Sequence, residues 1–183
     1  MPSSKNELRA ILLARPLPTA QPSLELLETL PAIATVTTVA AFISLPSEPS
    51  TLGLRAWLRT RGIRVLLPIL EADNSLSWAA DGGAFATGRL GLMTPTGPTT
   101  ELALAELMIV PALAIGPHGE RLGRGGGSYD RALAGWRAAR PDGVVLAWVL
   151  DRDLRNDLPT EGHDEGVDAA VTESQLLVFD ALG

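Results

Sequence analysis

The residues best suited to chemistry lie in one stretch, GERLGRGGGSYDRAL at positions 119–133, which combines five glycines with three arginines. Glycines let a backbone approach a ligand closely and turn several N–H groups toward it. Arg121 and Arg124 add guanidinium groups whose forked donors match phosphate oxygens. The alternative is a flexible solvated turn, but so many glycines cost folding entropy. We therefore interpret residues 119–133 as an anion-binding loop.

This loop differs from the familiar nucleotide-binding motifs. No Gly-Lys-Ser/Thr follows it, and Ser128 stands where the third glycine of G-x-G-x-x-G would fall. A catalytic triad of Ser128, His163 and an aspartate lacks support, because there is no G-x-S-x-G elbow and the spacing does not fit. The loop alone therefore indicates a phosphorylated ligand without specifying the reaction.

Carboxylates lie next to the glycines and again near the C-terminus. Asp130 either caps the helix expected after the loop or holds Mg²⁺ near phosphates. The second group, within residues 157–174, is either a solvated acidic face or the source of a second carboxylate for the same metal. Only two histidines and no cysteines are present, which argues against a zinc site. The side chains of this second group are Asp157, Glu161, His163, Asp164, Glu165 and Asp168.

Composition excludes several classes of function. The net charge of -6 and the absence of a basic tail argue against general nucleic-acid binding. The lack of cysteine excludes disulfides and thiolate metal sites. The apolar run near the N-terminus is too short for a signal peptide or a membrane span. We expect a cytoplasmic monomer that acts on a small molecule, with no nucleic-acid or membrane partner.

Hydrophobic periodicity then divides the chain into alternating helices and strands, which predicts a three-layer α/β fold. We expect a mostly parallel sheet with helices on both faces, in a single domain over residues 1–183. The glycine loop follows a strand and precedes a helix, where α/β folds bind ligands. The expected helices cover residues 4–14, 24–30, 51–61, 101–106, 128–140 and 174–181. The expected strands cover 34–44, 63–70, 107–111, 143–150 and 167–171, with weaker candidates at 78–80 and 85–92.

Four segments together resemble one enzyme family. LMIVPALAIGPHGERLGRGGGSYDRAL resembles the central motif of the 5-formyltetrahydrofolate cyclo-ligases, also called 5,10-methenyltetrahydrofolate synthetases. SKNELR near the start is similar to the K-x-x-L-R of this family, and FISLPSEPST to its first-strand segment. LPTEGHDEGVDAAVTES is similar to its C-terminal acidic segment. All four occur in family order.

The resemblance implies a Rossmann-like fold and an ATP- and Mg²⁺-dependent reaction. The γ-phosphate of ATP would phosphorylate the formyl oxygen of 5-formyltetrahydrofolate, polyglutamylated or not. N10 would then close the ring to 5,10-methenyltetrahydrofolate, with release of ADP and phosphate. The protein mainly has to position two ligands and neutralise charge.

The resemblance also implies roles for individual residues. Lys5 and Arg124 would be catalytic, and Asp130 and Asp164 would bind the metal. Substrate contacts would come from Ile43, Glu48, Arg124, Gly125, Gly126, Gly127 and Ser128. ATP contacts would come from Lys5, Asn6, Glu7, Leu8, Arg9, Arg121, Leu122, Gly123, Arg124, Gly125, Gly126, Gly127, Ser128 and Tyr129.

The only lysine, Lys5, falls on the ATP position of the family, whereas the other fourteen basic residues are arginines. The folate side departs from the family pattern: Ser128 replaces an aromatic residue, and Thr94 precedes Pro95 where glutamate is usual. These departures leave a second hypothesis open, a non-catalytic or regulatory nucleotide-binding relative that has lost folate turnover. A sugar-phosphate or CoA enzyme of the same topology is a third, resting on fold analogy alone.

Overall fold

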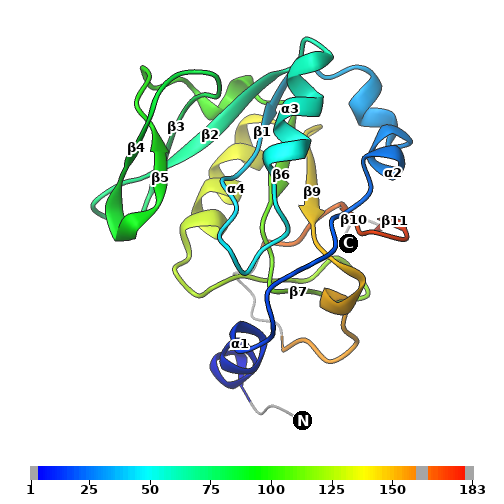
Figure 1. Ribbon diagram of the computed structural model, residues 1–183. Coiled ribbons are helices and arrows are strands. Elements are labelled where there is room, and N and C mark those ends of the chain that lie inside the picture. The colour runs from blue at the N-terminus through cyan, green and yellow to red at the C-terminus, as the bar shows by residue number, and fades with distance from the viewer. Residues whose placement is uncertain (1–3, 160–164, 180–183) are drawn as a thin grey trace.

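The computed structural model describes residues 4–159 and 165–179. A seven-stranded sheet forms its centre, in the order β11-β10-β9-β6-β1-β2-β3 (Figure 1). The five inner strands are parallel, and the two edge strands pair antiparallel. The strands are β1 (Thr38–Ala40), β2 (Arg64–Leu70), β3 (Leu76–Ala80), β6 (Leu107–Val110), β9 (Val144–Trp148), β10 (Ala169–Val171) and β11 (Leu176–Val178).

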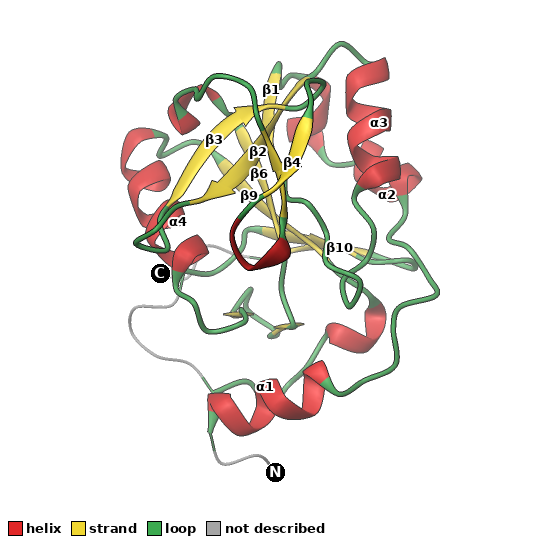
Figure 2. Cartoon of the chain, turned by 60° about the vertical axis from the view of Figure 1, so that its left-hand side comes forward, coloured by secondary structure: helices red, strands yellow, loops and turns green. Residues whose placement is uncertain are grey.

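Helices cover both faces of this sheet (Figures 1 and 2). Leu54 of α3 (Leu52–Thr60) shares an apolar cluster with Val39 of β1, and α2 (Leu24–Glu28) packs on the same side. Leu133 of α4 (Ser128–Ala139) belongs to a second cluster, which contains the next strand residue, Ala40. Successive strand residues thus point to opposite faces, and both faces are buried, as parallel sheets require. The predicted three-layer α/β fold is confirmed.

The first helix, α1 (Lys5–Leu13), lies apart from the sheet, at its carboxyl-end side (Figure 2). Ser4 caps it by accepting a hydrogen bond from the Glu7 N–H. Its buried Leu8 and Leu12 belong to a small apolar cluster with Leu122. That cluster includes the two-stranded sheet of β7 (Ala114–Ile115) and β8 (Arg121–Leu122), which the sequence did not predict.

A hairpin of β4 (Phe85–Thr87) and β5 (Met93–Pro95) forms a third, two-stranded sheet. Figure 1 shows it projecting beside β2 and β3. The strand predicted over 85–92 ends at Thr87, because a 3-10 turn, η2 (Arg89–Gly91), reverses the chain with Gly91 at φ +73°. The remaining 3-10 segments are η1 (Pro31–Ala34), η3 (Leu102–Leu104) and η4 (Asp151–Asp153).

Three further element predictions were wrong. The helix expected over 174–181 is replaced by β11 within the described residues, because the Thr172 hydroxyl accepts from the N–H groups of Ser174 and Gln175 and turns the chain back along β10. The helix expected over 101–106 is only the short η3. The strand expected over 34–44 is reduced to β1, since Pro31 begins η1 before it and a cavity loop follows. No helix among the described residues is long and apolar enough to span a membrane.

Candidate active site

A cavity of about 660 Å³ opens beyond the carboxyl ends of β1 and β6. The chain passes from β1 to β2 on one side and later places β6 on the other, so the strand order reverses between β1 and β6. Open α/β sheets bind ligands at such a reversal, because the two departing loops separate there. The lining residues are Phe42, Ile43, Ser44, Leu45 and Pro46 after β1, and Pro111, Ala112 and Leu113 after β6.

The glycine loop and the start of α4, from Gly123 to Asp130, form one wall of the cavity, the glycine wall. Gly125 and Gly127 have φ of +96° and +66°, which side-chain-bearing residues rarely adopt. Within residues 4–159 and 165–179, no group accepts a hydrogen bond from the backbone N–H groups of residues 124–128. These donors lie at the N-terminus of a twelve-residue helix that has no side-chain cap. Donors that lack a partner in the described part of the chain, together with a helix dipole, suit an anion such as phosphate.

Helix α1 is attached to this loop from outside the cavity. The Arg9 Nε donates to the Gly123 carbonyl at 2.9 Å, and the Arg9 Nη1 donates to the Asn6 Oδ1 at 2.8 Å. Lys5 is buried on the same helix, whereas Asn6 and Glu7 are exposed. Leu8 and Leu122 are buried in the apolar cluster beneath the loop. Arg9 thus joins the K-x-x-L-R segment to the loop, and Lys5 lies one helical turn before it on α1.

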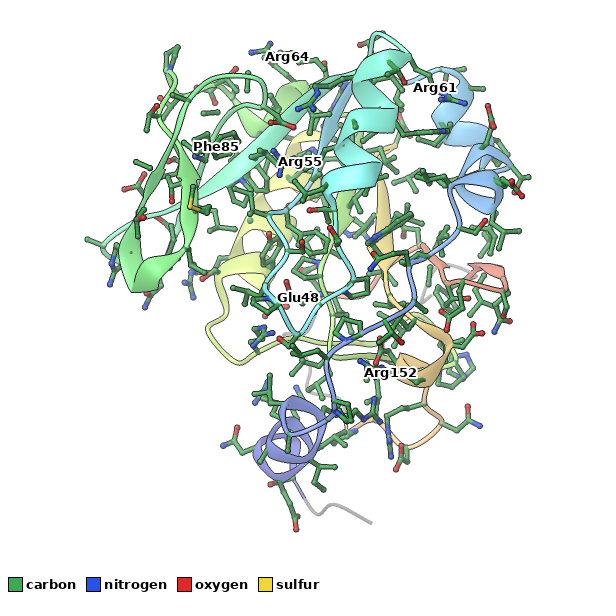
Figure 3. All side chains as sticks on the ribbon, viewed as in Figure 1. Glu48, Arg55, Arg61, Arg64, Phe85 and Arg152 are labelled. Atoms are coloured by element: carbon green, nitrogen blue, oxygen red, sulfur yellow. The ribbon has the colours of Figure 1, made fainter. Side chains whose placement is uncertain are left out.

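Glu48 lies opposite the glycine loop and is paired with it. The Arg124 Nε donates to the Glu48 Oε1 at 3.0 Å, and the Arg124 Nη2 donates to the Ser47 hydroxyl. The other oxygen, Glu48 Oε2, accepts from the Leu45 N–H at 2.8 Å. Figure 3 shows Glu48 on the loop that runs from the sheet toward α1. The buried Thr51 fixes this loop, because its hydroxyl donates to the Phe42 carbonyl at 2.7 Å.

Arg121 and Asp130, which both line the cavity, form an ion pair. The Arg121 side chain is only 2% exposed, and its guanidinium also donates to the Pro111 and Glu165 carbonyls. Tyr129, next to Asp130 on α4, also lines the cavity. Burial raises the pKa of the Tyr129 phenol, and the negative charge of Glu48 raises it further. The phenol therefore stays protonated and available as a donor at neutral pH.

The predicted metal ligands can be assessed only in part, because Asp164 lies outside the described residues. Among those described, no group of three or more His, Cys, Asp or Glu side chains could hold a metal ion. Asp130 lies on the cavity wall beside the N–H groups of residues 124–128, with about a third of its side chain exposed. Mg²⁺ commonly takes one or two carboxylates and completes its shell with water and substrate phosphates. The position of Asp130 therefore fits a metal–phosphate complex.

Sequence reasoning missed the opposite, apolar wall. Strand β2 supplies Pro68 and Leu70 to this wall, and β3 begins with Leu76. The sequence identifies Thr94 as a departure from the family pattern but gives no sign that it lines the cavity. No sequence signal shows that a hairpin will fold across the end of a strand some twenty residues away. The hairpin supplies Gly91, Leu92, Met93 and Thr94.

The comparisons with known proteins agree with this geometry. The model of the "5-formyltetrahydrofolate cyclo-ligase family" matches residues 4–173. The chain belongs to the 5-formyltetrahydrofolate cyclo-ligase family. A 5-formyltetrahydrofolate cyclo-ligase of Mycolicibacterium smegmatis is 34% identical over 150 residues, covering 77% of this chain and 76% of the relative. One from Escherichia coli K12 is 32% identical over 155 residues, covering 81% of this chain and 84% of the relative.

Two solved structures share the fold. The 5,10-methenyltetrahydrofolate synthetase of Aquifex aeolicus superposes with a TM-score of 0.78 at 24% identity, covering 98% of this chain and 95% of the other. The synthetase of Mycoplasma pneumoniae gives a TM-score of 0.69 at 17% identity, covering 93% and 99%. Family membership confirms the resemblance that the four segments indicated, and it implies the use of ATP.

Proposed function

We propose that the cavity binds ATP and 5-formyltetrahydrofolate side by side, with the triphosphate on the glycine wall and the folate along the apolar wall. As a 5-formyltetrahydrofolate cyclo-ligase, the enzyme converts 5-formyltetrahydrofolate to 5,10-methenyltetrahydrofolate. The observation that carries this arrangement is the run of N–H groups at residues 124–128 that find no acceptor among the described residues, in a cavity whose other wall is largely apolar. Phosphate needs the first surface, and an aromatic ring system needs the second.

The proposed chemistry has two steps. The formyl oxygen attacks the γ-phosphorus, so that a P–O bond forms while the bond to the β-phosphate bridging oxygen breaks and ADP leaves. N10 then attacks the formyl carbon, N10 loses its proton, and the C–O bond breaks to release phosphate. Phosphorylation is needed because an amide-like oxygen is a poor leaving group and phosphate is a good one. The enzyme contributes position and charge compensation.

We assign the positive charges near the glycine wall to the triphosphate. Arg124 is the cation best placed on that wall, and its guanidinium can stabilise charge on the transferring phosphoryl group. Lys5 and Arg9 would hold the triphosphate from α1, which Arg9 attaches to Gly123. Asp130 and, by the family resemblance, Asp164 would hold Mg²⁺, which when bound neutralises phosphate charge.

We assign Glu48 to the pterin ring of the folate. A carboxylate can accept together from the adjacent N–H donors of a pterin. Ile43 lies on the same loop and would supply apolar contact beside the ring. We further propose that the enzyme works as a monomer in the cytoplasm, where ATP is available, and that residues 1–183 act as a single domain on a folate with or without a polyglutamate tail.

A spectrophotometric assay tests the proposal. Purified protein, Mg²⁺-ATP and 5-formyltetrahydrofolate are mixed, and the near-ultraviolet absorbance of the methenyl product is followed. We expect ATP-dependent product formation that Asp130→Asn abolishes and Asp142→Asn, an exposed change beyond the far end of α4, leaves unaltered. Absence of product from a protein that binds Mg²⁺-ATP would contradict folate turnover. Full activity of Asp130→Asn would contradict the metal assignment.

A further inference from the structure

The β4–β5 hairpin covers the apolar wall of the cavity without belonging to the main sheet. Its two strands form a sheet of their own, and β5 lies against β2. The cavity-lining part is the turn and β5, where Leu92 and Met93 present apolar side chains. Met93 is 48% exposed, although it faces the cavity. Side-chain contacts at the base of the hairpin add to the packing of β5 on β2.

One such contact begins with a buried carboxylate. Asp81 directly follows β3, and its side chain is only 1% exposed. Arg55 of α3 donates two parallel hydrogen bonds to the Asp81 carboxylate, Nε to Oδ2 at 2.8 Å and Nη2 to Oδ1 at 2.7 Å. The Arg59 Nη1 donates to Oδ2 at 2.7 Å from the solvent side. This paired geometry fixes the plane of the Arg55 guanidinium.

The same guanidinium reaches the base of the hairpin. The Arg55 Cζ lies over the Phe85 ring, 5.4 Å from its centroid. Phe85 is the first residue of β4 and pairs with Pro95, the last residue of β5. Figure 3 shows Arg55 and Phe85 pointing toward each other from α3 and the hairpin. A cation–π contact, strengthened by the burial of Arg55, thus joins the hairpin to the α3 layer.

We propose that Arg55 and Phe85 are positioning residues that hold the β4–β5 hairpin over the folate end of the cavity, with Asp81 orienting Arg55. This inference rests on the proposed function for the identity of the ligand. The hairpin contributes nothing to the glycine wall, and its lining side chains are mostly apolar. A loosened hairpin therefore weakens contact with the folate and leaves the triphosphate site intact.

Phe85→Leu tests the role in catalysis, because leucine keeps an apolar side chain and removes the ring face. We expect the KM for 5-formyltetrahydrofolate to rise about five- to tenfold, with the KM for ATP unchanged. Phe85→Tyr keeps the ring and should restore the folate KM. Arg59→Gln is the matched control, because it removes a contact of Asp81 without touching the ring. Equal folate KM values for wild type and Phe85→Leu, or no rescue by tyrosine, would overturn the proposal.

Hydrogen exchange tests the hairpin contact independently of folate turnover. In the ligand-free protein, the backbone amides of residues 85–94 should exchange faster in Phe85→Leu than in wild type, and at the wild-type rate in Arg59→Gln. Unchanged exchange in Phe85→Leu would overturn the positioning role. If the wild-type protein formed no methenyl product, the proposed function would fail, while this measurement would still decide whether the contact holds the hairpin.

Discussion

The glycine loop and the β4–β5 hairpin face the same cavity, but the loop is shaped by its backbone and the hairpin by distant side chains. The loop depends on positive φ values at Gly125 and Gly127 and on N–H groups within five consecutive residues. The hairpin depends on Arg55 and Phe85, which come from separate elements. A compact sequence motif can therefore encode the proposed anion site, whereas the apolar wall exists only in the assembled fold.

This comparison predicts separable effects of substitution, the largest of them at Arg124. Arg124→Gln should lower kcat about a hundredfold or more, because glutamine carries no charge to stabilise the transferring phosphoryl group. Steady-state kinetics with each substrate varied in turn measure the change. Arg64→Gln is the control, because Arg64 is exposed at the opposite end of the molecule (Figure 3). A loss of kcat below tenfold would mean that the backbone donors of the loop stabilise the phosphoryl group without this side chain, which would contradict the role assigned to Arg124.

The next largest effect is expected at Glu48, which is paired with Arg124 of the glycine wall but is assigned to the folate. Substitution shows which of the two ligands Glu48 serves. Glu48→Gln should raise the KM for 5-formyltetrahydrofolate roughly tenfold, since a neutral amide replaces a charge-assisted acceptor. ATP affinity, measured by calorimetry without folate, should stay unchanged. The exposed Glu101→Gln provides the control. Weaker ATP binding with an unchanged folate KM would assign Glu48 to the glycine wall instead.

Lys5→Arg keeps the positive charge and tests whether α1 contributes to ATP binding without affecting folate binding. We expect the KM for ATP to rise about fivefold, because a planar guanidinium does not replace a compact ammonium at a buried position. The folate KM should not change. Arg61→Lys, the reverse exchange at a surface site, should alter neither constant. Wild-type ATP kinetics in Lys5→Arg would contradict the assignment of Lys5.

The same division explains how much of the fold the sequence could reveal. The strands near 63–70, 107–111 and 143–150 were predictable, because strands buried on both faces read as continuous apolar runs. The C-terminal Leu176–Val178 is also apolar, but its periodicity does not separate a helix from a strand. Pairing with β10 decides the outcome, and such pairing is a property of the folded chain.

For the candidate site, the predictable part was the part that is contiguous in sequence. Gly123 to Asp130 lie together on one wall, and the resemblance added Ile43 and Glu48, which line the same cavity. Arg55 and Phe85 belong to no recognisable motif, because a cation–π contact between a helix and a hairpin requires no fixed spacing in the sequence. The wall formed by long-range packing was therefore invisible in the sequence.

The smallest effect is expected at Ser128, where a larger side chain on the glycine wall would contact the folate. Ser128 begins α4 on the glycine wall, at a position where the family usually has an aromatic residue, and it lines the cavity. Ser128→Tyr should lower the folate KM about two- to threefold, because a ring here adds apolar contact for the folate. Ser128→Ala separates loss of the hydroxyl from gain of the ring and should leave the folate KM unchanged. A higher folate KM in Ser128→Tyr would mean that the folate itself occupies the space beside Ser128. The apolar contact that an aromatic residue makes there in the family would then come from the hairpin in this enzyme.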